Sequence, residues 1–551
     1  MSVYKWPQRA LKDCEQMIRN FLWTGDPSKR KSVVLKCDKV CSPFEEGGLG
    51  LRRLEIMNKA LLMKFWWKIQ NSKEDWAIFF QEKFITKKGD WIGYYKKSSI
   101  LPGLKWISED VQKFTTWIVG TGSKISVWND TWIKDKPLCE LYPDNAYLNE
   151  FPVMKVENLI VDNEWVMPSE LLDMVLINEL PVLSLEEDKR IWSGTITGDF
   201  SVSSAVECIR TKYSKVSWVH QVWNYSIYPN ISSNIWKLIR NIFPTDEKMK
   251  TKKFQLASRC CFCKKDEETL IHILWKCNYS ELIWKWLGGM FNFKNLKSFD
   301  EVFSFAKHKS PAVGEIWRYA AFITLRELWF QRNRSVYEDE VFNEQNIKSR
   351  ILKLTAEEEI RMKQLMWNTA YDLQMLKKFG MKCRRVKTCV VKEISFKLPQ
   401  KNQLLLCCYG ASRGNPGNSG YGIMARNDKG EVVVAIEGGL GLLLISLRKL
   451  WQFFVQENGL SIMVSESFFS VQTQKQQNLR VPWFAIDRWK QICNIATKCE
   501  FLHNYRELNF SANYLANRGA TMQRGDQHIY TSKPPFLVNL ENEKQKYFRT
   551  V

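Results

Sequence analysis

Residues 259–277 read RCCFCKKDEETLIHILWKC. Four potential metal ligands in this stretch follow the spacing C-x2-C-x8-H-x4-C, namely Cys260, Cys263, His272 and Cys277. Two thiolates two residues apart can hold one ion from a tight turn, and a later histidine and cysteine can complete a tetrahedron. Because thiolate and imidazole ligands suit zinc, we predict a structural zinc site here. Cys261 is a weaker first ligand because it would form a C-x-C pair. The alternative to a metal site is a set of buried free cysteines around a core histidine.

The residues that flank the cluster extend this pattern to W-K, P-T, C-x-x-C, E-x-x-x-H, C and a closing tryptophan. In this chain the pattern consists of Trp236, Lys237, Pro244, Thr245, Cys260, Cys263, Glu268, His272, Cys277 and Trp284. It resembles the zinc-binding segment that follows reverse transcriptase in plant non-LTR (LINE-type) retrotransposons. The resemblance implies that the chain is a C-terminal part of such a polyprotein.

Further segments resemble neighbouring parts of the same polyprotein. Those near the N-terminus resemble the region downstream of the polymerase palm, and they are Phe21–Gly25, Gly47–Gly50 and Asn58–Leu62. Those farther along resemble the next family block and the helix before the RNase H domain, and they are Trp117–Gly122, Trp128–Trp132 and Trp329–Asn333. The palm itself is not covered. Because the aromatic-x-Asp-Asp motif is missing from the sequence, we predict that this chain does not polymerise DNA.

The sequence changes to a β pattern after Pro399. Three apolar stretches, LLLCCYGA, YGIMARN and EVVVAIEG, are separated by the turns Gly-Asn-Pro-Gly and Asp-Lys-Gly. Short polar turns between apolar stretches predict an antiparallel β-meander. Residues 404–521 resemble the plant RNase H-like domain, on the segments Tyr409–Gly417, Gly420–Gly422, Val464–Ser467, His503–Asn509 and Ser511–Ala516. The resemblance implies an α/β domain with a mixed sheet, and hydrolysis of RNA in RNA–DNA hybrids with two Mg²⁺ ions.

Most of the carboxylates that this chemistry requires are missing from the sequence. At the family positions, Tyr409 replaces the first-strand acid, Asn513 replaces the last acid, and Glu466 stands in for an aspartate after the fourth strand. The glutamate of the first helix, which would lie near Gly439, is deleted, and Glu437 is expected at the end of the third strand. His503 matches a histidine that the RNase H family associates with product release. We therefore predict that this RNase H centre is inactive. Magnesium is expected as a cofactor only in the alternative case of an active centre.

Charge and composition favour a polyanionic partner. The chain has 81 Lys and Arg against 59 Asp and Glu, a formal net charge of +22, and nucleic acid is the commonest partner for such a charge. The turn residues Arg413, Gly414 and Asn415 are candidate nucleic-acid contacts, with a plain hairpin turn as the alternative. Residues 361–401 carry eleven basic residues and two acids. They form either a phosphate-contacting arm or a solvated linker.

Several wider expectations follow from composition. We predict helix over Ile56–Gln70 from its apolar spacing and strands over residues 98–135. We expect no signal peptide and no membrane span. Because the fifteen cysteines lack a secretory context, an intracellular location is expected, and the basic cluster Lys382–Lys387 raises the possibility of the nucleus.

The expected fold is mixed, with mostly helical N-terminal and zinc-binding regions followed by an α/β RNase H-like domain. The predicted divisions are a post-palm remnant (1–90), a connecting region (91–185), the zinc-binding segment (186–295), a helical and basic linker (296–400), a degenerate RNase H-like domain (401–525) and a tail (526–551). The sequence favours a nucleic-acid-binding remnant without catalysis. The alternatives are an RNA–DNA hybrid ribonuclease with unusual metal ligands and a decayed element with no selected function.

Overall fold

The structure is a computed structural model of the whole chain. It describes residues 3–550 apart from 31–34, 87–90, 95–97, 176–179, 182, 185, 196, 294–295, 387, 389, 402, 415–416, 444–467, 474–498, 504 and 524–525. For residues 441–443, 468–473 and 499–503 only the backbone is described. The chain forms two compact units. The first contains residues 1–7, 55–210 and 389–551, and the second contains residues 8–54 and 211–388.

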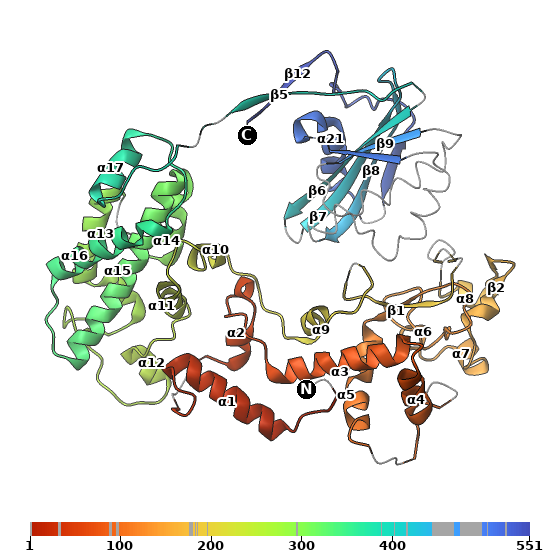
Figure 1. The fold of residues 1–551 in the computed structure, drawn as a ribbon, viewed down its shortest axis with the longest axis horizontal. Helices are drawn as coiled ribbons and strands as arrows, with labels where there is room; N and C mark the ends of the chain where they lie inside the picture. The colour runs from red at the N-terminus through yellow and green to blue at the C-terminus, as the bar shows by residue number, and fades with distance from the viewer. Residues whose placement is uncertain are drawn as a thin grey trace. The chain divides into compact units, whose positions relative to one another are not determined.

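The second unit is built around one long helix, α15 (Pro311–Tyr337). This helix is apolar on nearly every side, with Ile316, Phe322 and Leu328 all buried, as expected of a helix surrounded by others. It begins at a proline, and the Ser310 side chain accepts a hydrogen bond from the Val313 N–H at 3.3 Å. Its neighbours include α11 (Pro229–Ile239), α13 (Asn278–Phe291), α14 (Phe299–Phe305), α16 (Glu344–Glu357) and α17 (Ala370–Lys378) (Figure 1).

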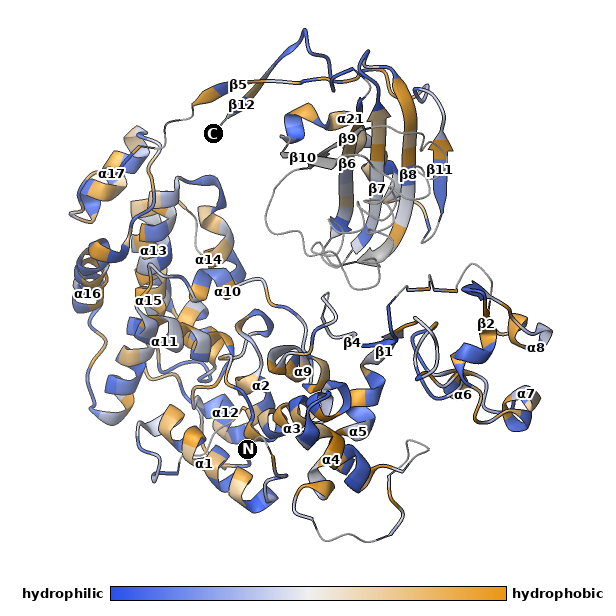
Figure 2. Ribbon diagram, turned by 45° about the vertical axis from the view of Figure 1, so that its right-hand side comes forward, coloured by the Kyte–Doolittle hydropathy of each residue, from blue (hydrophilic) through white to orange (hydrophobic). Residues whose placement is uncertain are grey.

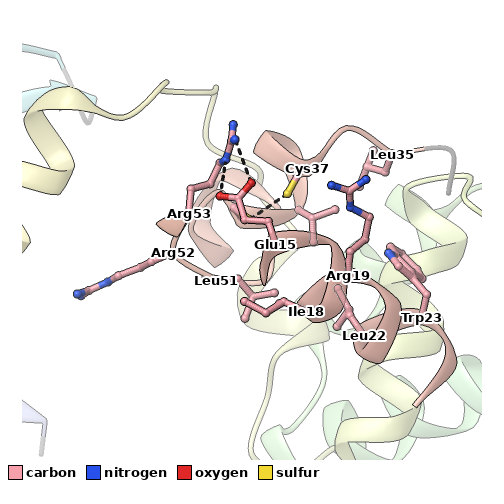
Figure 3. A pocket seen from close by; sticks show the side chains of 12 residues that line it. Glu15, Ile18, Arg19, Leu22, Trp23, Leu35, Cys37, Leu51, Arg52 and Arg53 are labelled. Carbon is pink, nitrogen blue, oxygen red and sulfur yellow. Dashed lines mark hydrogen bonds and ion pairs between the residues drawn. The ribbon is translucent and has the colours of Figure 1, made fainter. Parts of the chain in front are cut away.

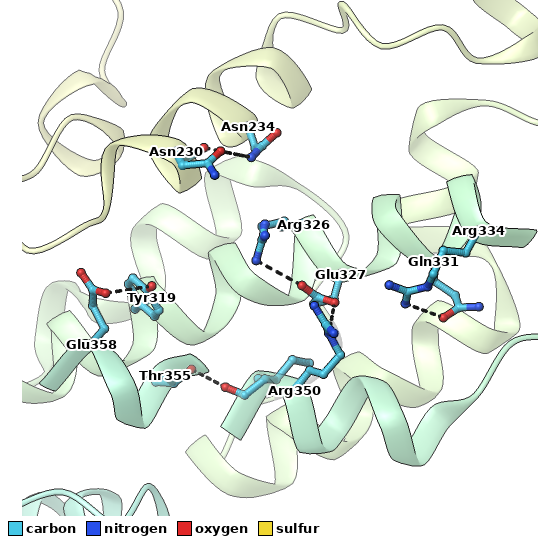
Figure 4. A network of polar contacts seen from close by, with 11 residues as sticks. Asn230, Asn234, Tyr319, Arg326, Glu327, Gln331, Arg334, Arg350, Thr355 and Glu358 are labelled. Carbon is cyan, nitrogen blue, oxygen red and sulfur yellow. Dashed lines mark hydrogen bonds and ion pairs between the residues drawn. The ribbon is translucent and has the colours of Figure 1, made fainter. Parts of the chain in front are cut away.

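The buried acid Glu327 of α15 is neutralised by two neighbouring arginines. Glu327 is completely buried, and its carboxylate lies 3.3 Å from Arg326 and 2.7 Å from Arg350 of α16 (Figure 4). The Tyr319 hydroxyl donates to Glu358 at 3.2 Å, so α15 and the segment after α16 are joined by polar contacts as well as apolar packing. Paired in this way, the charges avoid the cost of isolated buried carboxylates.

The remaining elements of this unit are short except for the first. They are α1 (Gln8–Thr24), α2 (Cys37–Cys41), η1 (Phe44–Glu46), α10 (Val219–Val222), α12 (Asp246–Thr251), the π-helical turn η4 (His272–Lys276), η5 (Ala306–His308) and η6 (Glu358–Arg361).

In the first unit, the predicted helix over residues 56–70 is confirmed as α3 (Leu54–Asn71). The prediction of strands over residues 98–135 is wrong for most of its length, because residues 101–113 form the helix α5 (Leu101–Lys113). Its buried residues Leu104, Ile107 and Val111 share one helical face, a spacing that the β-rich composition farther along obscured.

The other elements of residues 55–210 are also short. They are α4 (Asp75–Phe84), β1 (Thr115–Ile118), α6 (Leu138–Leu141), α7 (Ala146–Glu150), η2 (Val156–Leu159), β2 (Ile160–Val161), β3 (Glu164–Trp165), α8 (Ser169–Leu172), β4 (Lys189–Trp192) and α9 (Val202–Ile209). Asp188, just before β4, accepts the backbone N–H groups of Gly120 and Gly122 at 2.9 and 2.8 Å. A side chain at Gly122 would meet backbone atoms of Glu157, which explains why the motif has a glycine there.

Residues 403–530 form a six-stranded mixed sheet in the order β10-β9-β6-β7-β8-β11. Strands β6 (Gln403–Gly414), β7 (Gly417–Arg426) and β8 (Val432–Leu443) are the predicted antiparallel meander. Strands β9 (Phe468–Thr473) and β10 (Cys499–His503) continue the sheet in parallel beside β6. The sheet thus has an antiparallel meander on one side of β6 and two parallel strands on the other. This is the expected α/β RNase H-like arrangement, and the predicted fold class is confirmed.

The helix α21 (Phe510–Gly519) lies against β6, β7 and β8, covering one face of this sheet (Figures 1 and 2). The close approach explains the Gly-x-Gly motif. A Cβ at Gly422 would lie 2.4 Å from the Ala512 oxygen, and one at Gly420 would lie 2.0 Å from the Ala520 nitrogen. Only glycine lets the helix backbone rest directly on β7 at these two positions.

Residues 526–551 contain two strands that pair with earlier ones. β11 (Gln527–Tyr530) pairs with β8, and β12 (Lys546–Thr550) pairs with β5 (Val391–Ser395). A buried ion pair also holds this stretch, because Arg426 of β7 contacts the Glu541 carboxylate and donates to the Glu541 backbone oxygen at 2.8 Å. The short helix η8 (Arg506–Leu508) precedes α21. Among the parts of the chain that the structure describes, no helix has the length and apolarity needed to cross a bilayer.

Candidate zinc centre and RNase H-like site

The four predicted zinc ligands come together in the second unit. One ligand atom from each of Cys260, Cys263, His272 and Cys277 lies within 4.8 Å of the others. The Sγ atoms of Cys260 and Cys277 are 4.0 Å apart, and Cys263 Sγ is 3.4 Å from His272 Nε2. Cys261, the weaker alternative, is outside this group.

These separations fit a tetrahedral zinc site. With Zn–S near 2.3 Å and Zn–N near 2.0–2.1 Å, tetrahedral geometry separates ligand atoms by roughly 3.5–3.8 Å. The side chains of Cys260, His272 and Cys277 are buried, and Cys263 is half-buried. Burial and four protein ligands fit a closed structural site better than a catalytic one, which keeps a position open for water.

Two local backbone features bring the ligands together. Lys264, directly after the second cysteine, has a φ of 56°, and its N–H donates to the Cys260 oxygen at 2.9 Å, closing the turn. The Cys277 N–H donates to the His272 oxygen at 2.8 Å, which makes the π-helical turn η4. In an α-helix, residues five apart point roughly 140° away from each other. The wider π turn instead lets His272 and Cys277 face one ion.

The electrostatics of the cluster favour a thiolate. The pKa of Cys260 is lowered because the thiols of Cys261 and Cys277 donate to its sulfur. The His272 Nδ1 atom, which faces away from Cys263, has the Asp266 carboxylate 3.8 Å away. A carboxylate on this side of the ring favours presenting the Nε2 lone pair to a metal. Asp266 was not predicted as part of the site, and its only signal in the sequence is its place between the ligands.

A buried ion pair joins the ligand-bearing segment to α15. Glu268 and Arg332 are almost fully buried, and Arg332 donates two hydrogen bonds to the Glu268 carboxylate at 2.5 and 3.1 Å. Glu268 also accepts the Asp246 N–H at 3.2 Å, at the start of α12, where Thr245 is the N-cap. Glu268 therefore joins α15 to the start of α12. It does so through Arg332 and the turn at Thr245, which are residues of the family pattern far apart in the sequence.

The closing tryptophan of the motif is also structural. Trp284 stacks on Trp275 with ring centroids 5.0 Å apart and donates to the Leu274 oxygen at 2.8 Å. Trp236 donates to the Gly47 oxygen at 2.9 Å, which places the Gly47–Gly50 segment against the same core. Trp284 thus fixes the backbone of η4, which carries His272, and Trp236 fixes the Gly47–Gly50 segment.

In the RNase H-like domain, Tyr409 and Asn513 lie on β6 and α21. Tyr409 packs beside Ala411, Ala516 and Ala520, on the side of the sheet that α21 covers. Asn509, at the start of α21, donates to the Cys408 oxygen at 2.9 Å, and Asn513 follows one turn later. The Asn513 side-chain oxygen accepts a hydrogen bond from Asn517 at 3.0 Å. These two family positions therefore present a phenol and an amide.

The expectation that Glu437 ends the third strand is wrong, because it lies in the middle of β8. Its carboxylate is almost fully buried and is already bound. Arg518 donates to it at 2.8 Å and the Tyr530 hydroxyl donates at 3.0 Å. His528 Nδ1 is 3.4 Å from the same carboxylate. The glycine-rich sequence after Glu437 continues the strand to Leu443.

Other predicted site residues fall wholly or partly outside the described residues. Glu466 and Asn415 are outside them, and the side chain of His503, the last residue of β10, is not described. The strand β9 begins at Phe468, two residues after Glu466 in the sequence. In the sequence after Glu466, the next acid is Asp487. Arg413 and Gly414 lie at the exposed end of β6, where the chain turns into β7.

A pocket in the second unit is lined by α1, α2 and the segments around them. Its lining residues are Glu15, Ile18, Arg19, Leu22, Trp23, Leu35, Cys37, Val40, Cys41, Leu51, Arg52 and Arg53 (Figure 3). Arg53 donates to Glu15 at 3.1 and 3.3 Å, and the Sγ atoms of Cys37 and Cys41 are 3.7 Å apart. A hydrogen bond from Cys41 lowers the pKa of Cys37 to about 7. The C-x3-C spacing was the only sequence signal for this thiol pair.

Comparisons with known proteins agree with this arrangement. A family described as zinc-binding in reverse transcriptase matches residues 200–284, which include all four clustered ligands. A protein of Arabidopsis thaliana named as a candidate ribonuclease H is 28% identical over 313 residues, which are 52% of this chain and 48% of that protein. The chain thus spans about half the length of this relative.

Two further similarities were found. An uncharacterised mitochondrial protein of Arabidopsis thaliana is 26% identical over 149 residues, covering 25% of this chain and 91% of that protein. A crystal structure of LC11-RNase H1 in complex with an RNA/DNA hybrid is 18% identical, with a TM-score of 0.20, and covers 22% of this chain and 97% of that one. The matched zinc-binding family, the ribonuclease H relative and the order of the mixed sheet agree. Together they support a likeness to retrotransposon proteins in which a reverse-transcriptase zinc-binding segment is followed by an RNase H-like domain.

Proposed function

We propose that this chain binds nucleic acid without cleaving it. In this proposal a zinc ion held by Cys260, Cys263, His272 and Cys277 stabilises the helical unit, and the RNase H-like domain acts as a binding module. The observation that carries the proposal is the replacement of acids in that domain: β6 presents Tyr409, α21 presents Asn513, and Glu466 is the one acid that the sequence keeps at a family position.

The charges favour this proposal over hydrolysis. Four carboxylates supply about −4 to balance the +4 of two Mg²⁺ ions, whereas Glu466 alone supplies about −1. Without compensating charge, two divalent ions about 4 Å apart repel each other strongly. Glu437 is a poor substitute for the missing helix glutamate. Its carboxylate already accepts hydrogen bonds from Arg518 and Tyr530, and its backbone is paired within the sheet. Loss of the ions also removes the means of activating water.

The remaining surface still suits nucleic acid. The net charge of +22 attracts a polyanion, and Arg413 is exposed at the β6–β7 turn. Backbone N–H groups and arginine at such turns commonly contact phosphates. We therefore place Arg413, Gly414 and Asn415 at a contact with the backbone of an RNA–DNA hybrid, or of single-stranded RNA or DNA.

Fluorescence anisotropy with a labelled RNA–DNA hybrid, measured over a series of salt concentrations, tests binding by the full chain. The logarithm of the association constant should fall linearly with the logarithm of the salt concentration, by about 0.9 for each neutralised phosphate. Arg413→Ala should make this slope shallower by about one contact. Lys353→Ala, an exposed charge on α16, is the matched control. Salt-independent or undetectable binding would leave a decayed element as the better account.

A further inference from the structure

Two exposed tyrosines in the second unit are held next to the segment that follows α16. The rings of Tyr225 and Tyr228 are 59% and 52% exposed. The Gln364 side chain donates to the Tyr225 hydroxyl at 2.7 Å, and the Arg361 guanidinium lies 5.2 Å from the centre of the Tyr228 ring. Side chains held by such contacts lose little conformational freedom when a ligand stacks on them.

The segment after Arg361 alternates between buried and exposed residues. Met362 and Met366 are buried, whereas Lys363 and Trp367 are exposed, with Trp367 at 48%. Met366 forms a parallel bridge with Val386, and its N–H donates to the Arg385 oxygen at 3.0 Å. This pairing places the basic run that begins at Lys382 directly beside the exposed ring and lysine.

The acids that contact this surface are paired, hydrogen-bonded or buried. Glu315 is buried 3.5 Å from the Tyr225 hydroxyl, and Glu359 accepts a hydrogen bond from the Lys382 N–H at 2.6 Å. Glu358 lies 3.5 Å from Arg361, and Glu359 lies 4.0 Å from Arg384. Asp372 is buried and accepts hydrogen bonds from Ser310 and the Trp367 N–H. By contrast, no ion pair within the described part of the chain involves the exposed residues Lys363, Lys382 and Arg385. The surface therefore has uncompensated positive charge beside exposed aromatic rings.

We propose that this aromatic–basic surface, formed by Tyr225, Tyr228, Lys363, Trp367, Lys382 and Arg385, binds single-stranded nucleic acid. Bases would stack on the three rings, and the lysines and Arg385 would contact phosphates. Aromatic platforms with interspersed basic groups bind single strands with little sequence preference, because every base offers a flat face. Paired bases in a duplex are already stacked on each other, so the rings favour an unpaired strand. The surface deepens the proposed nucleic-acid binding and rests on it, but it lies outside the RNase H-like domain.

The test uses the full chain with labelled oligo(dT), oligo(U) and an RNA–DNA hybrid as probes in anisotropy titrations. Tyr228→Ala with Trp367→Ala should weaken oligo(dT) and oligo(U) binding by at least about fivefold per ring while the salt slope stays constant. Tyr228→Phe with Trp367→Phe keeps the rings and should bind as the unmodified chain does. Lys363→Ala with Arg385→Ala should instead reduce the salt slope by about 0.7 per residue.

Controls separate this surface from the rest of the chain. Tyr94→Ala removes a similarly exposed ring from the first unit, and Lys353→Ala removes an exposed charge from α16; both should leave single-strand binding unchanged. Hybrid affinity at the Arg413 turn should be the same in the Tyr228/Trp367 variant as in the unmodified chain. If the chain binds single strands but no hybrid, and Tyr228→Ala with Trp367→Ala weakens the single-strand binding, this inference stands and hybrid binding fails. If it binds the hybrid while Tyr228→Ala with Trp367→Ala leaves oligo(dT) binding unchanged, the surface is overturned and hybrid binding stands.

Discussion

Replacing Cys277 with serine is expected to abolish zinc binding and to unfold much of the zinc-binding segment. Cys277 is fully buried, its sulfur lies 4.0 Å from that of Cys260, and it directly precedes α13. Structural zinc contributes on the order of 10 kcal/mol in small zinc domains, and losing one of four ligands forfeits much of that. Metal analysis should fall from about one zinc per chain to almost none. Thermal unfolding followed by circular dichroism should begin at a much lower temperature.

Two other cysteines provide matched controls for this experiment. Cys383→Ser changes an exposed thiol of the same unit, and Cys261→Ser changes the neighbour of the first ligand, outside the cluster. Both variants should retain zinc and the original unfolding temperature. Zinc retained by Cys277→Ser, or lost only in Cys261→Ser, would mean that the ligand set is different from the one proposed.

The second large effect is expected from Arg332→Met, which leaves the Glu268 carboxylate buried without its partner. Burial lowers the pKa of Arg332, but hydrogen bonds and charge from Glu268 and Tyr337 outweigh this and leave the pKa raised, so the guanidinium stays charged. Removing one member of a buried pair costs about 3–5 kcal/mol. Urea unfolding, followed by the helical signal, should show a loss of that size.

The double variant distinguishes an unpaired charge from lost packing. Glu268→Leu combined with Arg332→Met removes both charges and should recover most of the stability, because apolar replacements of a buried pair are often neutral. Glu327 is paired with both Arg326 and Arg350. Arg326→Met should therefore lower the free energy of unfolding by less than Arg332→Met does, because Arg350 remains 2.7 Å from Glu327. A double variant as unstable as Arg332→Met alone would show that the pair contributes through its shape and not its charge balance.

Local patterns were predictable from the sequence, whereas distant contacts were not. The meander β6–β8 followed from apolar stretches and polar turns, and the grouping of Cys260 with Cys263 followed from spacing within one turn. The π turn between His272 and Cys277 has no such signature in the sequence. Its i→i+5 hydrogen bond spans the buried residues Ile273, Leu274 and Trp275. Arg332 is 64 residues from Glu268, and no local pattern could pair them.

The errors also have physical causes. Residues 101–113 are helical because Leu104, Ile107 and Val111 find a core to bury in, although the neighbouring composition is β-rich. Glu437 was expected at a strand end, but β8 continues past it through two glycines. These glycines make room at close contacts, where a Cβ on Gly438 would lie 2.3 Å from the Tyr421 hydroxyl oxygen. In both cases tertiary packing outweighed local propensity.

The central claim is that the RNase H-like domain of this chain binds nucleic acid but does not cleave it. The most direct measurement is hydrolysis of a labelled RNA–DNA hybrid by the purified full chain, in Mg²⁺ and separately in Mn²⁺, with binding read by gel shift from the same samples. The account predicts a salt-sensitive shift of the hybrid and no cleavage above the protein-free control with either ion. Metal-dependent cleavage that disappears in Glu466→Ala would contradict it, because other groups would then have to complete the metal centre around that carboxylate.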